Sequence, residues 1–107
     1  MVCALWLAAS AHAQTIDVFE VKGVAVDVTD ESAAAARDKA LVLGEGLAFR
    51  RMLERLTLRA DHEHLPDLPS SEIAAYVRDF SIELEKRSAV RYLASLIYRF
   101  KPAEVRR

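Results

Sequence analysis

The sequence predicts an α+β domain of order β-α-α-β-β, in which two helices pack on one face of a three-stranded, antiparallel-rich sheet. Three observations indicate this fold. A segment rich in β-branched residues covers positions 16–28, a long helical pattern follows over positions 29–58, and two-residue alternation begins at position 80. Apolar residues at helical spacing mark one buried face of a helix, whereas alternation marks a half-buried strand.

The first strand is expected to bend at Gly23. Residues 16–28 read IDVFEVKGVAVDV, and β-branched side chains such as these favour a strand. The apolar side chains before the glycine alternate on one face, and those after it follow the opposite phase: Phe19 and Val21, then Val24, Val26 and Val28. A phase shift at a glycine is typical of a β-bulge, so we predict one bent strand that leads into the long helix.

The long helix is predicted to begin at Thr29 or Asp30, because a short side-chain oxygen can accept from the free N–H groups of the first turn. Asp30 and Glu31 would place negative charge at the positive end of the helix dipole. The alanines at positions 33–36 have high helix propensity. Helical spacing predicts one buried face, which comprises Leu41, Val42, Ala48, Phe49, Met52, Leu53 and Leu56.

Two glycines interrupt this helix, and each costs about 1 kcal/mol relative to alanine. We expect Gly44 and Gly46 to mark a kink or a close approach of the helix to the sheet. A phosphate-binding loop is rejected, because Phe49 stands where a dinucleotide fingerprint needs its third glycine. Glu45, between them, is expected to point towards the apolar face as a satisfied or snorkelling carboxylate. The alternative is a lone catalytic acid.

A polar loop of about ten residues is predicted after residue 58, because Pro66 and Pro69 disfavour helix before them. It holds the one cluster of metal-capable groups in the sequence: Asp61, His62, Glu63 and His64. Helical ligand pairs need i, i+4 spacing, which H-E-H does not provide. In an extended loop His62 and His64, with Asp61, would hold a metal weakly. A solvated loop is favoured, since no further ligand is evident.

The second helix is expected to begin at Ser70 or Ser71 and to end near Asp79. Its predicted inner face comprises Ile73, Val77 and Phe80.

Two strands are predicted to end the domain, joined by a loose turn over residues 86–90. In the first, one face is apolar and the other polar: Phe80, Ile82 and Leu84 against Ser81, Glu83 and Glu85. The last strand is expected over Arg91–Phe100. Its inner face comprises Tyr92, Ala94, Leu96, Tyr98 and Phe100.

The opposite face of the last strand carries Leu93 and Ile97, although a face that meets water should be polar. They are either scattered surface residues or a contact surface. We interpret Leu93 and Ile97 as a candidate interaction surface, whose partner would be an envelope protein, a downstream domain or a second copy.

The N-terminus is predicted to be an export signal. Residues 1–13 read MVCALWLAASAHA and end in the small-x-small pattern Ala11-His12-Ala13, which signal peptidase recognises. Cleavage after Ala13 would leave residues 14–107 as a single α+β domain without the chain's one cysteine, Cys3. The segment is shorter than a usual signal peptide and has no basic residue before the apolar run. A start codon assigned too far downstream would explain both features. A membrane anchor is the second interpretation, but about 20 apolar residues are needed to span a bilayer and this run is too short. A buried N-terminal helix is the third interpretation.

The length and the net charge of the chain limit its class and its partners. The chain has 107 residues, enough for one domain with a modest core. Its formal net charge of −1 gives no sign of nucleic-acid binding, and we predict no transmembrane segment in the mature chain.

Four stretches follow one another as VKGVAVDVT, AAARDKAL, LAFRRMLERLT and RYLASLIYRFKPAEV, from about Phe19 to Val105. Together they resemble the bacterial domain-of-unknown-function family 2066, whose members carry similar blocks in the same order. The resemblance implies an exported protein in which this domain lies near the N-terminus and further sequence follows. It implies no catalytic residues.

Two functions are carried forward. The first is a periplasmic or exported, non-catalytic interaction or assembly module that uses the sheet face around Leu93 and Ile97. The alternative is a small metal-dependent protein or hydrolase that uses the loop from Asp61 to His64. No catalytic or cofactor-binding residues are predicted, because the sequence offers no convergent set of nucleophile, base and oxyanion donors.

Overall fold

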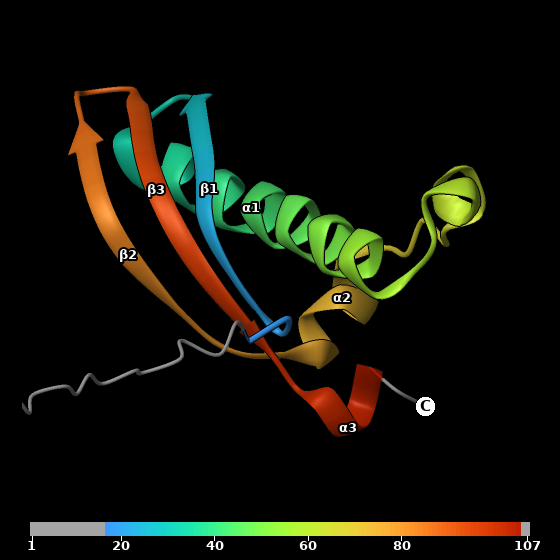
Figure 1. The fold of residues 1–107 in the computed structure, drawn as a ribbon. Helices are drawn as coiled ribbons and strands as arrows, with labels where there is room; N and C mark the ends of the chain where they lie inside the picture. Colours follow the sequence, from blue (N-terminus) through green and yellow to red (C-terminus); the bar gives the residue numbers. More distant parts are fainter. Residues whose placement is uncertain (1–16, 106–107) are drawn as a thin grey trace, which may run out of the picture.

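Three antiparallel strands and one long helix form the framework of the chain (Figure 1). The computed structural model describes residues 17–105, so the predicted signal segment and Cys3 lie outside the described residues. The elements follow in the order β1 (Glu20–Thr29), α1 (Ala33–Leu56), the 3₁₀ helix η1 (Arg59–His64), α2 (Ser70–Tyr76), β2 (Val77–Arg87), β3 (Arg91–Phe100) and α3 (Pro102–Val105).

The sheet has the strand order β1-β3-β2, with β3 antiparallel to both neighbours. The edge strands β1 and β2 therefore run parallel to each other, and β3 lies between them. A strand, a helical crossover and a second strand separated by an inserted one make up a split β-α-β unit. The predicted α+β fold with a three-stranded antiparallel sheet and helices packed against it is confirmed.

Strand β1 contains the predicted bulge. Its pairing with β3 shifts between Val21 and Val24, and Gly23 has a φ of +67°. Only glycine adopts this left-handed conformation without strain. The shift returns the apolar side chains to the inner face on both sides of the bend: Phe19, Val21, Val24 and Val26 are all buried.

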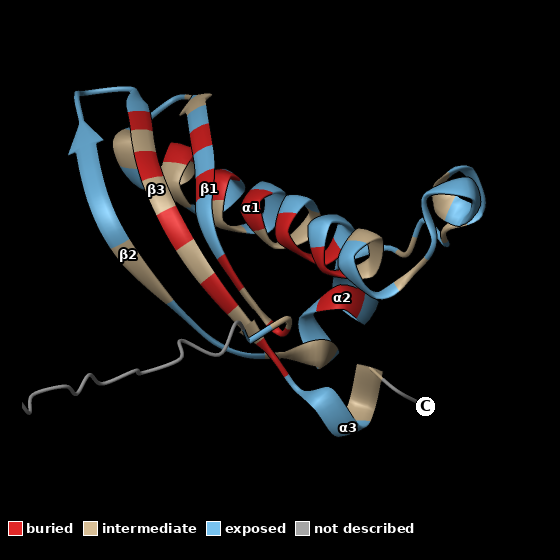
Figure 2. Ribbon diagram, in the orientation of Figure 1, coloured by how far each residue is buried: buried red, intermediate tan, exposed pale blue. Residues whose placement is uncertain are grey.

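Strand β3 has the predicted bounds and the predicted inner face. All five inward residues are buried, as the banding along β3 shows (Figure 2): Tyr92, Ala94, Leu96, Tyr98 and Phe100. Because β3 is the central strand, these side chains form the middle of the core beneath α1.

Helix α1 begins at Ala33, and its N-cap lies two to three residues later than the predicted caps Thr29 and Asp30. Ser32 is the N-cap, and its Oγ accepts from the N–H of Ala35 at 3.0 Å. Thr29 pairs with Arg91 in the sheet, and the N–H of Asp30 donates to the carbonyl of Val90 at 2.8 Å. These strand contacts hold both residues extended and thereby delay the helix.

The buried face of α1 differs from the predicted one. It is formed mainly by small residues at four-residue spacing: Ala36, Ala40, Gly44 and Ala48, followed by Phe49 and Met52. Two residues assigned to the buried face are instead exposed, Val42 by 51% and Leu56 by 43%. Small side chains let the helix lie close to the sheet, so the larger residues beside them are turned outward.

The two glycines of α1 have different surroundings. A Cβ on Gly44 would lie 2.7 Å from the hydroxyl oxygen of Tyr98 and 3.2 Å from Leu96 Cδ1, so the close approach predicted here is confirmed. A Cβ on Gly46 would meet no atom within 4 Å. The helix is continuous through both positions.

Helix α2 and strand β2 depart from the prediction. The N-cap of α2 is Pro69, without a side-chain hydrogen bond, and the helix ends at Tyr76. Val77 and Phe80, predicted to line its inner face, belong to β2, and Phe80 is 40% exposed. Because α1 packs on β1 and β3, β2 lies largely outside its cover (Figure 2).

A register shift between β2 and β3 moves Leu84 to the outer face of the sheet, away from α1. It falls between Ile82, which pairs with Leu96, and Leu84, which pairs with Ser95. Leu84 was predicted to share a face with Phe80 and Ile82, but it is 63% exposed on the face away from α1. The following turn is shorter than predicted, since β2 continues to Arg87.

The edge of β1 is capped by side chains of α1. Arg51 donates to the backbone carbonyl of Gly23 at 3.2 Å, and Arg55 donates to that of Glu20 at 2.9 Å. Two carbonyl groups at this edge therefore have side-chain donors.

We expect Gly44→Ala to lower the free energy of unfolding and Gly46→Ala to raise it. Overpacking against Tyr98 costs about 1–3 kcal/mol, and the gain of about 1 kcal/mol from replacing a helical glycine offsets only part of it. At Gly46 a Cβ would meet no atom within 4 Å, so only the gain in helix propensity applies. Urea unfolding followed by circular dichroism measures both. Equal effects of the two changes would contradict the close approach at Gly44.

Candidate interaction surfaces

The outer face of the sheet, which points away from α1, carries an apolar hollow. Leu93 and Ile97 lie half-buried on this face, as predicted for residues not covered by the helices. Leu84 from β2 and Ala25 from β1 join Leu93, because both pair with Ser95 across β3. The hollow has a volume of about 380 Å³. Its lining comprises Ala25, Val26, Asp27, Leu84, Lys86, Leu93, Ala94 and Ser95.

Ile97 lies outside this hollow. It pairs with Ser81, one outward position further along β3 than Ser95. The structure therefore groups Leu93 with Leu84, which the sequence had placed on the opposite face, and sets Ile97 apart from them.

Ion pairs lie on both sides of the hollow. Arg91 makes two hydrogen bonds to the carboxylate of Asp27, at 2.9 and 2.8 Å, and these hold the pKa of Asp27 below its usual value. At the other end Arg99 donates to Glu20 and to Asp79, each at 2.9 Å, and so links all three strands. The Arg91–Asp27 pair is exposed, whereas the Arg99–Glu20 pair is half-buried. Surface pairs contribute little stability, but both pairs fix the positions of polar groups around an apolar centre.

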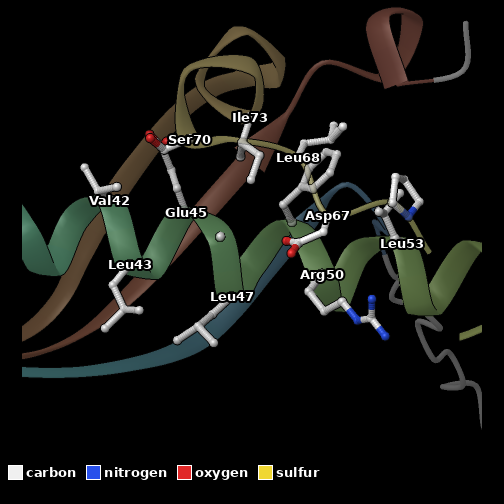
Figure 3. A pocket seen from close by; sticks show the side chains of 13 residues that line it. Val42, Leu43, Glu45, Leu47, Arg50, Leu53, Asp67, Leu68, Ser70 and Ile73 are labelled. Carbon is white, nitrogen blue, oxygen red and sulfur yellow. The ribbon is translucent and has the colours of Figure 1, made fainter. Parts of the chain in front are cut away.

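A second hollow lies between α1 and the segment that leads into α2 (Figure 3). We call it the α1 groove; its volume is about 320 Å³. It is lined from α1 by Val42, Leu43, Glu45, Gly46, Leu47, Phe49, Arg50 and Leu53, and from the other side by Pro66, Asp67, Leu68, Ser70 and Ile73.

Glu45 lines the α1 groove instead of lying over the buried face of the helix. Figure 3 shows its side chain extending from α1 on the side where α2 begins. Burial raises the pKa of Glu45. Among the hydrogen bonds and ion pairs of residues 17–105 none involves this carboxylate, so Glu45 is not the satisfied carboxylate of the prediction. The side chain is half-buried, and the snorkelling and catalytic-acid alternatives stay predictions.

Tyr98 lies close to Glu45 but does not bond to it. Its hydroxyl donates to the carbonyl of Leu41 at 2.6 Å. Burial, and then the negative charge of Glu45, raise the pKa of Tyr98. The hydroxyl is therefore a fixed neutral donor beneath α1.

The predicted loop from Asp61 to His64 forms the 3₁₀ helix η1. His62 Nε2 lies 3.0 Å from the carbonyl oxygen of Glu54, and Arg50 donates to the carbonyl of His62 at 2.6 Å. In the described part of the chain, no three His, Cys, Asp or Glu side chains form a group that could hold a metal ion. Asp61, His62 and His64 thus gain no further ligand from the fold.

The α1 groove was missed at the level of sequence, although a signal for it exists. Leu43 and Leu47 are one turn apart and lie off the predicted buried face, and both are exposed. Unpartnered leucines at helical spacing indicate a second apolar side.

Comparison of the chain with models of known protein families finds no match, and comparisons with curated proteins and with solved structures find none either. Among the helices of residues 17–105, none has the length and apolar character needed to cross a membrane.

We expect Glu45→Gln to stabilise the protein more at pH 7 than at pH 4. The folded-state pKa of Glu45 is raised above its ordinary value of 4.5, so the folded state binds the proton more tightly than the unfolded state. The stability of the native protein then falls, relative to the glutamine variant, as pH rises above that value.

Urea unfolding of both proteins at several pH values measures this difference. The exposed Glu63→Gln variant reports the general effect of removing one negative charge. A difference between native and Glu45→Gln proteins that is constant with pH would contradict the burial of the carboxylate.

Proposed function

We propose that this chain is a non-catalytic interaction module of the bacterial cell envelope, and that it binds another protein through the outer face of its sheet. The observation that supports the proposal is the apolar hollow of about 380 Å³ around Leu93, with Leu84 63% exposed beside it. Apolar surface gathered in one place and bordered by polar groups is characteristic of a contact site.

The chemistry of this face suits burial better than proton transfer. The carboxylate of Asp27 is held by Arg91, and those of Glu20 and Asp79 by Arg99. Leu84, Leu93 and Ala25 offer only apolar area. A partner that covers them would gain about 25 cal/mol for each Å² of apolar surface removed from water. The candidate partners are an envelope protein, a downstream domain and a second copy.

Placement in the envelope is supported by sequence alone. The support is the apolar segment that ends in Ala11-His12-Ala13 and the resemblance to the exported family 2066.

Photo-crosslinking tests the contact. A photoreactive residue at position 93 is expected to give crosslinked products in bacterial cells that express the chain, whereas one at exposed Ala60 on η1 is not. Adding Leu84→Thr and Ile97→Thr to the probe-bearing chain removes apolar surface and should reduce the products about tenfold. Threonine is preferred to aspartate because it retains strand propensity.

The matched control keeps the photoreactive residue at position 93 and carries Ala60→Thr and Ala103→Thr, two exposed positions outside the sheet. Its crosslinked products should not decrease. Products of the mass of two chains would identify a second copy as the partner. Crosslinking from position 93 that does not exceed that from position 60, or that persists in the threonine variant, would refute the proposed surface.

Export is tested separately by the N-terminus of the protein recovered from cells. If the signal is cleaved after Ala13, mass spectrometry of the periplasmic fraction should find a chain that begins at Gln14. A chain recovered only in the cytoplasm, with residues 1–13 retained, would contradict export.

A further inference from the structure

We propose that the α1 groove binds an apolar peptide segment of a partner protein that carries a lysine or an arginine. The groove lies on the helical side of the domain, on the opposite layer from the outer face of the sheet (Figures 1 and 3). It is therefore a second contact site, independent of the one proposed above.

The apolar part of the site is arranged as a floor and a rim. Phe49 from α1 and Ile73 from α2 are buried at the floor, with exposed fractions of 6% and 7%. At the rim the side chains are open to solvent: Val42 by 51%, Leu43 by 49% and Leu47 by 40%. Figure 3 shows Leu43 and Leu47 projecting together from one side of α1 and Val42 from another. Apolar side chains of a partner would thus contact both rim and floor.

Gly46 keeps the middle of the groove open. It follows Val42 by one helical turn and lines the groove, and a Cβ placed on it would meet no atom within 4 Å. A glycine inside a helix costs about 1 kcal/mol relative to alanine. At Gly44 that cost is explained by the contact with Tyr98, whereas at Gly46 nothing in residues 17–105 needs the space. A partner that approaches the helix backbone would need it.

The charge of the groove determines the polar chemistry of its occupant. Two carboxylates line it, Glu45 and Asp67, and within the described residues neither has an ion-pair partner. The one cation in the lining, Arg50, is already engaged: it pairs with Glu54 at 3.1 Å and donates to the carbonyl of His62 at 2.6 Å. Burial raises the pKa of Glu45, as expected for a carboxylate that lacks a counter-charge. A lysine or arginine of the partner would supply it.

A peptide fits this arrangement because apolar rim positions repeat along a helix and a groove runs beside them. An amphipathic segment docks in such grooves through side chains at helical spacing. A volume of about 320 Å³ accommodates a few side chains, with the rest of the segment lying over the rim.

Selection from a random 12-residue peptide library displayed on phage tests the proposal. The protein purified from expressing cells is immobilised, and the library is first depleted on its Gly46→Met variant. Methionine favours a helix, and its Cβ would meet no atom within 4 Å, so a longer side chain at this position would occupy space in the groove. Enriched peptides are expected to combine apolar residues with at least one lysine or arginine. As synthetic peptides they should bind the native chain and lose about tenfold in affinity on Gly46→Met.

The charge requirement is tested with the double variant Glu45→Gln, Asp67→Asn, which should also weaken binding about tenfold, whereas Glu63→Gln should leave it unchanged. The triple threonine variant Leu84→Thr, Leu93→Thr, Ile97→Thr should bind the peptides as the native chain does. Peptide binding in the α1 groove is thereby tested independently of binding at the outer face of the sheet. Circular dichroism verifies that each variant folds.

Three results would overturn the proposal: no enrichment over the depleted library, enriched peptides without basic residues, or equal affinity for the native chain and Gly46→Met. Self-association in sedimentation experiments that Gly46→Met abolishes would assign the groove to a second copy and would likewise overturn it.

Discussion

The approach of α1 to the sheet at Gly44 sets the geometry of the rest of the domain. The missing side chain lets the helix lie against Leu96 and the hydroxyl of Tyr98, and that hydroxyl is fixed in turn by the carbonyl of Leu41. A helix held this closely buries alanines, and it can cover only the strands directly beneath it. The core therefore forms between α1 and the strands β1 and β3. The larger apolar side chains of α1 that a more distant helix would bury point to solvent.

Both proposed contact sites follow from that constraint. Strand β2 lies beyond the cover of α1, and the register shift after Ile82 turns Leu84 outward beside Leu93. On the other side of the molecule, the same orientation of α1 leaves Val42, Leu43 and Leu47 exposed around Gly46. The two surfaces are on opposite layers of one thin domain. If both proposed sites bind, the domain would hold two neighbours at once.

The sequence predicted those features that depend on neighbouring residues. The bulge at Gly23 and the alternation of β3 could be found because glycine and strict periodicity report local backbone geometry. The buried face of α1 was predicted wrongly because periodicity ranks leucine above alanine, whereas the close packing at Gly44 selects the smaller residue. The outward position of Leu84 had no glycine to signal it, and the α1 groove requires the chain near Leu68 to fold back on α1.

The two arginines that reach over β1 make the margins of the sheet unequal. Arg51 and Arg55 occupy the carbonyls of Gly23 and Glu20, so a strand that added there would have to displace two guanidinium groups. Strand β2 has no such cover among the hydrogen bonds of residues 17–105. Edge-to-edge growth needs both margins open. A sheet that is open at one edge only can add a strand there but cannot be extended from both edges.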